Sequence, residues 1–236
     1  MKSRSPKAAP KKSKSNRAVE PLFAVDHPPR SLLKDFDEQE VIEFLRRRDP
    51  KLGRLMKRIG PFRLKVDRKG SPYEWLLRSI IFQQLSGKAA GTIHGRVKDL
   101  FGGRNPTPEE VLTTPETALR GAGLSRQKIA AVKDLAKAAF EGRVPDRKKM
   151  SKLSDEEIIE LLIPIRGVGR WTVEMLLIFG LGRADVLAVD DFAIKKSAMI
   201  LHTLKEMPDR KTLSVLSERW KPYRTVASWY LWRSLD

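Results

Sequence analysis

Short helical segments bounded by capping residues make up most of the sequence after Asp37. In Thr107-Pro-Glu-Glu110 and Ser154-Asp-Glu-Glu157 a hydroxyl residue is followed three positions later by Glu. Such a pair caps the first turn of a helix, because the two side chains satisfy amide groups that have no partner within the helix. The pattern therefore predicts an all-α domain of about a dozen short helices.

Apolar residues at helical spacing support several of these segments. Pro50 is expected to open a helix, Ser125 to cap another, and Thr114-Pro115 to begin a short one that Gly121 or Gly123 ends. The predicted apolar stripes are Leu52, Leu55, Met56 and Ile59; Ala90, Ile93, Val97 and Leu100; and Ile129, Val132, Ala136 and Phe140. Only Phe62-x-Leu64-x-Val66 alternates as a strand does, and it is too short to make a sheet.

Positive charge is in large excess over the 236 residues. Lys and Arg number 47 against 29 Asp and Glu, which gives a net charge of +18 at pH 7. Such an excess favours a polyanionic partner, with nucleic acid first and an anionic membrane surface second. No apolar run approaches the ~18 residues of a membrane span, and no secretory core follows the basic N-terminus. We therefore expect a soluble, intracellular protein with no membrane partner.

The N-terminus concentrates part of this charge. Residues 1–19 contain seven Lys or Arg, two prolines, four serines and no acid, so that +11 remains on the rest of the chain. This composition predicts a disordered tail, which with a linker reaches residue 30 and leaves 31–236 as the folded domain. A DNA-tethering arm, a localisation signal and a solubilising extension are all compatible with it.

Cysteine is absent, and the only histidines, His27, His94 and His202, lie far apart in the sequence. The missing thiols exclude disulfides, thiolate nucleophiles and cysteine-held zinc or iron–sulfur clusters. A histidine-rich metal site is not expected either.

A glycine-containing turn between two helices carries the strongest local signal, in Leu161-Leu-Ile-Pro-Ile-Arg-Gly167-Val-Gly169-Arg-Trp-Thr172. Both glycines are expected to permit positive φ and to let another backbone come close. The amides after the turn lie at a helix N-terminus, where free N–H groups attract an anion. For so basic a chain, a DNA phosphate is the expected anion, and a simple helix–helix turn is the alternative.

This hairpin is followed about twenty residues later by Val186-Leu-Ala-Val-Asp190-Asp191-Phe-Ala-Ile-Lys-Lys196. The pair resembles the helix-hairpin-helix DNA glycosylase superfamily, in which the hairpin (161–172) grips the strand with the damaged base. The resemblance makes Asp191, in the segment 186–196, the catalytic aspartate and Asp190 its supporting neighbour. A plain helix N-cap is the ordinary alternative for such an aspartate.

Three further blocks resemble the alkylated-base branch of that superfamily, DNA-3-methyladenine glycosylase II. They are Ser79-Ile-Ile-Phe-Gln83-Gln84-Leu85-Ser86, Gly123-Leu-Ser-Arg-Gln-Lys128, and Glu218-Arg-Trp220-Lys-Pro222-Tyr-Arg224 with Trp229 and Trp232. The resemblance covers roughly residues 40–236 and implies two helical lobes with a DNA-binding cleft between them. It also implies an enzyme that flips out purines of the 3-methyladenine and 7-methylguanine type and hydrolyses their N-glycosidic bond, the first step of base excision repair.

The resemblance assigns further residues by family position. Trp171 and Trp232 become walls of the base pocket, and Gln84 or Leu85 becomes the wedge that fills the gap in the duplex. Core positions are the alternative for both tryptophans and for Leu85. The residues expected to hold the DNA phosphate are Gly167, Val168, Gly169, Arg170 and Thr172.

The residue at position 171 also bears on the type of chemistry. Bifunctional relatives, which also cut the strand, carry there a lysine that attacks the sugar as an amine. Arg170 cannot replace that lysine, because guanidinium stays protonated. We therefore expect base release without strand cleavage and without a required cofactor. The resemblance allows a structural Na⁺ or K⁺ on the carbonyls of Ile163, Ile165 and Val168.

Other functions remain open at this point. They are a glycosylase for deaminated or oxidised bases, a DNA-binding hairpin module without chemistry, and a basic helical scaffold for membranes or proteins. The carboxylate pair weighs against the module, and the lack of a long basic amphipathic helix weighs against the scaffold. The expected partner is double-stranded DNA with alkylated bases, bound by a monomer in the bacterial cytoplasm and nucleoid or in a eukaryotic nucleus.

Overall fold

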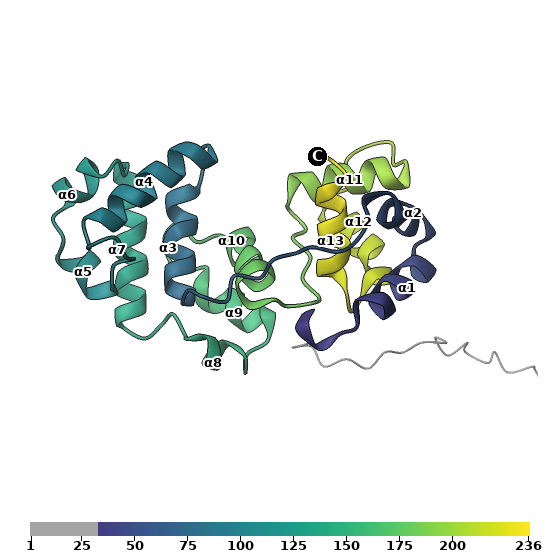
Figure 1. Cartoon of the computed structure of the whole chain (residues 1–236), viewed down its shortest axis with the longest axis horizontal. Helices are drawn as coiled ribbons and strands as arrows, with labels where there is room; N and C mark the ends of the chain where they lie inside the picture. The colour runs from purple at the N-terminus through teal and green to yellow at the C-terminus, as the bar shows by residue number, and fades with distance from the viewer. Residues whose placement is uncertain (1–32) are drawn as a thin grey trace, which may run out of the picture.

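The computed structural model describes residues 33–236, and the predicted tail and linker (1–30) lie outside that range. Within it the chain forms two helical lobes, which confirms the predicted all-α fold (Figure 1). One lobe holds α3 (Pro72–Phe82), α4 (Gly87–Asp99), α5 (Pro108–Thr113), α6 (Glu116–Gly121), α7 (Arg126–Phe140), α8 (Arg147–Met150), α9 (Asp155–Leu162) and α10 (Arg170–Met175). The other holds η1 (Leu33–Asp35), α1 (Glu38–Arg48), α2 (Pro50–Ile59), α11 (Phe192–His202), α12 (Arg210–Ser217), η3 (Glu218–Trp220) and α13 (Arg224–Arg233).

The helix boundaries follow the capping residues closely. Thr107 and Ser154 form complete capping boxes at α5 and α9, and Ser125 caps α7. The helix expected to begin at Thr114-Pro115 begins one residue later: α6 starts at Glu116, and its N-cap Pro115 makes no side-chain cap bond because proline has no side-chain acceptor.

Two apolar residues assigned to the predicted stripes lie outside the core. Leu100 is exposed just after the end of α4, and Phe140 is exposed as the last residue of α7. At a helix end the periodic face runs past the neighbouring helix that would cover it. The segment around Phe62–Val66 is extended and is not part of a β-strand.

The second lobe is built from helices of both the N-terminal and the C-terminal part of the described chain. Asp49 caps α2 through the Leu52 amide and accepts a hydrogen bond of 2.9 Å from Trp220 Nε1. His202 Nε2 lies 3.3 Å from the same carboxylate. Burial alone would raise the pKa of Asp49, but these donors outweigh it and lower the pKa to about 2. The buried carboxylate therefore ties α2 to the C-terminal helices.

Two extended segments, residues 61–71 and 182–190, connect the lobes (Figure 1). Arg147 of α8 fixes the first of them, because its guanidinium donates to the carbonyls of Asp67 and Gly70 at 2.7–2.9 Å. The same guanidinium donates to the carbonyl of Gly180. Gly180 belongs to η2 (Leu176–Leu181), a π-helical turn that continues α10. Arg147 thus joins α8 to two other chain segments, the first inter-lobe segment and η2.

Candidate active site between the lobes

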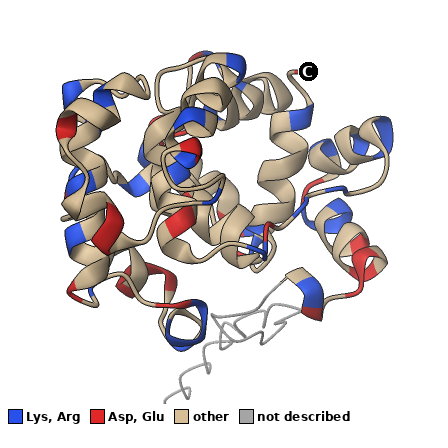
Figure 2. Ribbon diagram, turned by 60° about the vertical axis from the view of Figure 1, so that its left-hand side comes forward, with Lys and Arg blue, Asp and Glu red and all other residues tan. Residues whose placement is uncertain are grey.

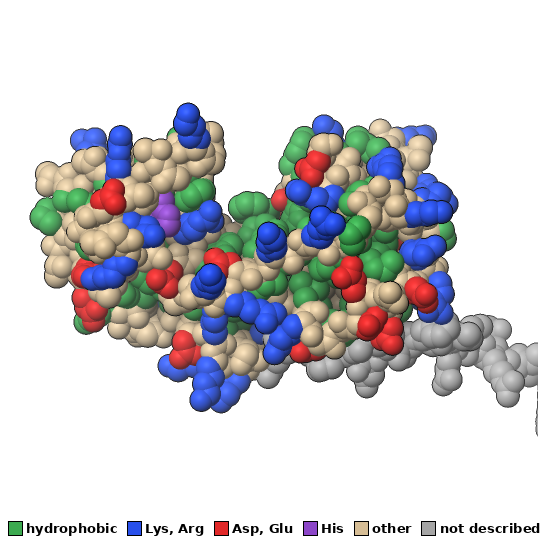
Figure 3. All heavy atoms as spheres, viewed as in Figure 1, with side chains coloured by type: hydrophobic (Ala, Val, Ile, Leu, Met, Phe, Trp, Pro, Cys, Tyr) green, Lys and Arg blue, Asp and Glu red, His purple; other side chains and the backbone are tan. Residues whose placement is uncertain are grey.

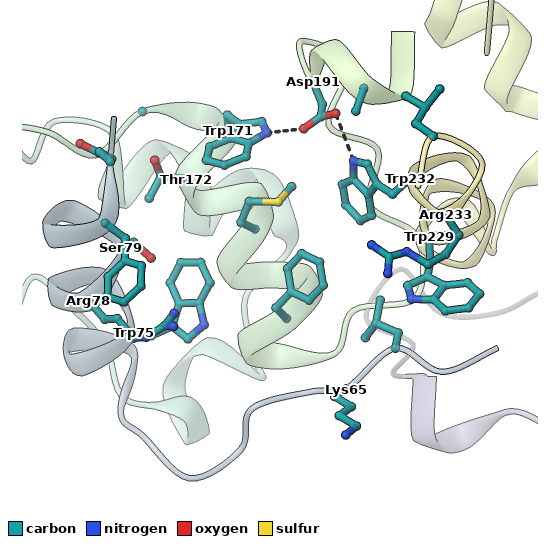
Figure 4. A pocket seen from close by; sticks show the side chains of 18 of the residues that line it. Lys65, Trp75, Arg78, Ser79, Trp171, Thr172, Asp191, Trp229, Trp232 and Arg233 are labelled. Atoms are coloured by element: carbon teal, nitrogen blue, oxygen red, sulfur yellow. Dashed lines mark hydrogen bonds between the residues drawn. The ribbon is translucent and has the colours of Figure 1, made fainter. Parts of the chain in front are cut away.

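A pocket of about 1190 Å³ lies between the two lobes. The space-filling view shows a notch between the two lobes (Figure 3). The close-up shows side chains that line the pocket (Figure 4). Several aromatic side chains line the pocket, and two aspartates, Asp191 and Asp236, lie among the lining residues. The side chains that enter the argument are Trp75, Arg78, Ser79, Trp171, Met175, Phe179, Asp191, Trp229 and Trp232.

Asp191 lines this pocket, as does Asp236 after the end of α13, and Asp191 is also the N-cap of α11. Its Oδ1 accepts from the Ile194 amide at 2.9 Å, so the helix-cap interpretation is confirmed, while the catalytic role stays a prediction. Two indoles donate to the same carboxylate (Figure 4): Trp171 Nε1 to Oδ2 at 2.8 Å and Trp232 Nε1 to Oδ1 at 3.1 Å. Three donors fix the carboxylate at the pocket edge, and none of them neutralises its charge.

The C-terminal signature places the segment that leads to Asp191. Arg224 binds Asp185 in a bidentate pair, with Nε–Oδ1 and Nη2–Oδ2 distances of 2.8 and 2.9 Å. Thr225 Oγ1 donates to the Arg183 carbonyl and accepts from the Val186 amide. Since Thr225 is fully buried at the start of α13, the extended segment is held in register with that helix. Arg224 and Thr225 of the signature therefore act on the site through the backbone, whereas Trp232 of the same signature contacts Asp191 directly.

Asp190 has a different environment from its neighbour. It is exposed, and its carboxylate pairs with Arg210 at 2.9 Å and with Lys195 at 3.7 Å. It is not among the residues that line the pocket. Its predicted supporting role stays a prediction, and its contacts restrict that role to holding α11 and α12 beside the site.

Trp171 and Trp232 both border the pocket, and their role as walls for a flipped base stays a prediction. Trp171 is 46% exposed and projects from the first turn of α10. Trp232 comes from the other lobe and stacks on Phe179, with ring centroids 5.6 Å apart and an interplanar angle of 27°. Phe179 reaches this place from the π-helical turn η2, a type of distortion that is frequent at functional sites.

Sequence reasoning missed much of the pocket wall. Trp75 and Arg78 lie on α3 and Phe179 on η2, and none stands in a motif that marks a base pocket. The available signal was the spacing of Trp75 and Arg78, which at i and i+3 share a helix face. That spacing is equally common in a core, so it could not have identified the site.

The hairpin glycines differ from each other. Gly167 has φ +81°, and a Cβ there would lie 2.8 Å from the Ala131 Cβ of α7. Gly169 has φ −91°, so the predicted positive φ is wrong for this residue, which instead precedes α10 as its N-cap. The space around Gly169 is open, and no side chain caps α10. Gly167 therefore fixes the turn, and Gly169 leaves an approach to the first amides of α10.

Other hairpin residues contribute mainly backbone. Val168 and Thr172 are buried, and Thr172 lines the pocket. Arg170 does not present a free guanidinium: it pairs with Glu156 at 2.6 and 2.8 Å and with Glu174 at 3.2 Å. Burial raises the pKa of Glu174 to about 7 in spite of Arg170. Any phosphate contact by Arg170 has to compete with these two carboxylates.

The wedge candidates lie at the C-terminal end of α3. Gln84 is exposed, lines the pocket and adopts φ +58°, a left-handed conformation that is unfavourable for a residue with a Cβ. Leu85 is 39% exposed, so it is not a core residue. Both side chains are available for contact with a duplex, and the geometry does not choose between them.

The carbonyls considered for a monovalent cation lie around the hairpin. Ile163 is the C-cap of α9, where the last carbonyls lack intrahelical partners, while the Ile165 carbonyl accepts the Val168 amide at 3.0 Å. Neutral carbonyl oxygens suit Na⁺ or K⁺, so the donor set is compatible with such an ion. Among residues 33–236 there is no cluster of three or more His, Cys, Asp or Glu that could hold a metal.

Basic residues are distributed over both lobes (Figure 2). Those that line the pocket are Arg63, Lys65, Arg78 and Arg233, from the inter-lobe segment, α3 and α13. No helix within residues 33–236 has the length and apolarity needed to cross a membrane.

Comparison with known proteins identifies the family of this chain. Residues 77–222 match the family model described as HhH-GPD superfamily base excision DNA repair protein. DNA-3-methyladenine glycosylase 1 of Schizosaccharomyces pombe is 42% identical over 183 residues, which cover 77% of this chain and 80% of that protein.

Two solved structures share the fold at substantial identity. The S. pombe 3-methyladenine DNA glycosylase in complex with abasic DNA superposes with a TM-score of 0.74 at 40% identity, covering 83% of this chain and 96% of that one. A DNA-3-methyladenine glycosidase from Bacillus halodurans gives a TM-score of 0.75 at 36% identity, covering 82% and 88%. Asp191 at the N-cap of α11, the glycine hairpin and the C-terminal signature accompany these matches. The chain belongs to the HhH-GPD superfamily of base excision DNA repair proteins, in the branch of the DNA-3-methyladenine glycosylases.

Proposed function

We propose that the chain is a monofunctional DNA glycosylase that removes alkylated purines of the 3-methyladenine and 7-methylguanine type. The observation that carries the proposal is Asp191, a carboxylate held by two indole N–H groups at the edge of an aromatic pocket. The S. pombe and B. halodurans relatives, a DNA-3-methyladenine glycosylase and a DNA-3-methyladenine glycosidase, support the same substrate class.

The chemistry follows from the charge on an alkylated purine. As the bond between C1′ and the base nitrogen breaks, both electrons leave with the base, which departs neutral. Positive charge grows on the deoxyribose, and a fixed carboxylate beside it stabilises that charge. Water then adds to C1′ and gives up a proton, for which Asp191 is the nearby acceptor. We propose that this reaction needs no cofactor.

The indoles provide the binding energy for the flipped base. A cationic base between Trp171 and Trp232 gains cation–π attraction together with the burial of apolar surface. Trp171 is exposed enough to be reached from the duplex, and Trp232 is backed by Phe179. A flipped base can therefore enter from the Trp171 side and rest against a preformed wall.

The DNA itself is held, in this proposal, by the hairpin and the wedge loop. Gly169 and the first amides of α10 receive a phosphate, and the carbonyls of Ile163, Ile165 and Val168 can hold a monovalent cation next to it. Gln84 or Leu85 fills the gap left by the base. The open space at Gly169 and the exposure of Gln84 support these roles. We further propose that the enzyme acts on double-stranded DNA as a monomer.

The direct test is release of free purines from methylated duplex DNA. Wild type is expected to release 3-methyladenine and 7-methylguanine, and Asp191→Asn to lose activity on the order of a hundred- to a thousandfold. Asparagine still caps α11, so the fold and DNA binding should survive. Duplexes with hypoxanthine or 8-oxoguanine serve as competitors, and preferential release of either would replace the proposed substrate class.

A further inference from the structure

The wedge loop and the phosphate-binding hairpin are joined by a direct contact that the proposed mechanism does not use. Gln83, the C-cap of α3, turns its side chain to the hairpin, where Nε2 donates to the Gly167 carbonyl at 2.9 Å. The next residue is Gln84, with its left-handed backbone. An unfavourable conformation of this kind persists only when the surrounding structure fixes it.

Lys128 on α7 also contacts the start of the wedge loop, at the C-terminal end of α3. Its Nζ donates to the Gln83 carbonyl at 2.8 Å and to the Ile81 carbonyl, so one cation serves the C-terminal end of α3. Burial lowers the pKa of Lys128. Because its donors are directed at backbone carbonyls, the position of the loop depends on this side chain.

The helix that carries Lys128 also holds the hairpin. Asp134 Oδ2 accepts from the Arg166 amide at 2.8 Å, and Ala131 packs so closely that Gly167 has no room for a Cβ. Lys128, Ala131 and Asp134 are spaced at i, i+3 and i+6 on α7, which spans about 9 Å along the helix axis. One rigid helix therefore contacts the wedge loop at one end and the hairpin at the other.

We infer that α7 and Gln83 lock the wedge loop and the hairpin into a single DNA-engaging unit, in which Gln83 and Lys128 are positioning residues. This inference rests on the proposed function. Gripping the phosphate then sets the depth at which Gln84 or Leu85 enters the duplex. In this inference Gln83, which borders the pocket, acts through the position of the wedge.

The test compares single-turnover release of 7-methylguanine by full-length variants. Gln83→Met keeps the length of the side chain and removes the Nε2 donor to the Gly167 carbonyl. We expect the rate of base release to fall about tenfold, because one net hydrogen bond is lost. Lys128→Met should reduce the rate about 10- to 100-fold, since a charged donor is lost. Lys133→Met is the matched control, because Lys133 on the same helix bonds the carbonyls of Leu112 and Thr114 away from the loop.

A second background separates coupling from simple stability. In a Gln84→Ala, Leu85→Ala protein without a wedge, Gln83→Met is expected to cause no further loss. An equal loss in both backgrounds, or wild-type release by Gln83→Met, would overturn the inference. Thermal unfolding checks that each variant is folded, and Gln83→Met, at a half-buried site, decides the question if Lys128→Met does not fold.

The proposed function and this inference fail in different ways. If wild type releases no purine, the proposed function is wrong, and the coupling is then measured on a duplex that holds an abasic analogue beside 2-aminopurine. Insertion of the wedge unstacks the fluorophore, so wild type should raise its fluorescence and Gln83→Met should raise it less. Equal signals from the two proteins would refute the coupling.

Discussion

Trp171 donates its indole N–H to Asp191 Oδ2 at 2.8 Å across the boundary between the two lobes. The side chain assigned to stack on the base is thus also one that orients the carboxylate. The contact between the lobes is therefore part of the site, because Trp171 belongs to α10 and Asp191 to the start of α11.

Two substitutions separate these roles of Trp171. Trp171→Phe keeps an aromatic face and loses the donor to Asp191, so the single-turnover rate should fall about tenfold. Trp171→Ala loses stacking as well and should fall further. Trp229→Phe is the control, since Trp229 lines the pocket but packs edge-on against Phe62. Equal rates for Trp171→Phe and wild type would show that the hydrogen bond has no catalytic effect.

Base removal should occur without strand cleavage. Trp171 stands where bifunctional relatives carry the lysine that attacks the sugar. Lys65, the lysine in the pocket lining, lies at the far end of the pocket from Asp191 (Figure 4). Borohydride added during turnover is expected to trap no covalent protein–DNA adduct. An adduct that persists in wild type and disappears in Lys65→Met would contradict the monofunctional mechanism.

The two hairpin glycines should respond differently to alanine. Gly167→Ala introduces both an unfavourable φ and a close contact with Ala131, so it should lower the free energy of unfolding by about 1–3 kcal/mol. Gly169→Ala has space and an ordinary φ, so stability should change little while binding of abasic DNA weakens. Urea unfolding and fluorescence anisotropy measure the two effects. Normal DNA binding by Gly169→Ala would mean that no phosphate approaches there.

Glu174 makes the stability of the fold depend on pH. Its pKa is raised from 4.5 to about 7 by burial, with Arg170, Asp190 and Arg210 as the charged groups around it. A raised carboxyl pKa stabilises the fold below about 4.5, and that stabilisation is lost as the pH rises to about 7. In the wild type the free energy of unfolding should therefore fall by about 3 kcal/mol at most between these two pH values. Glu174→Gln should remove this fall. Thermal unfolding at pH 5 and pH 8 tests this, with exposed Glu160→Gln as control; parallel slopes in Glu174→Gln and wild type would disprove it.

Local rules predicted the helices, because caps such as Thr107, Ser125 and Ser154 act within four residues of the helices they start. Motif position predicted the place of Asp191 and both indoles at the pocket edge. Trp75 and Phe179 escaped prediction because their role depends on how α3 and η2 meet, which no local pattern encodes. The pairing of Arg170 escaped for the same reason, since Glu156 lies on another helix.

The bond between Trp220 and Asp49 joins residues 171 positions apart. Contacts of such sequence separation form late, because a long loop has to close before they contribute any stability. On the ribosome, α3 to α10 can pack as soon as they emerge, whereas α1 and α2 wait for the last helices of the chain. The carboxylate side of the cleft is therefore completed only after η3 and α13 have been made, and a chain that stops before them has the hairpin but lacks the bonds of Trp220 to Asp49 and of Trp232 to Asp191.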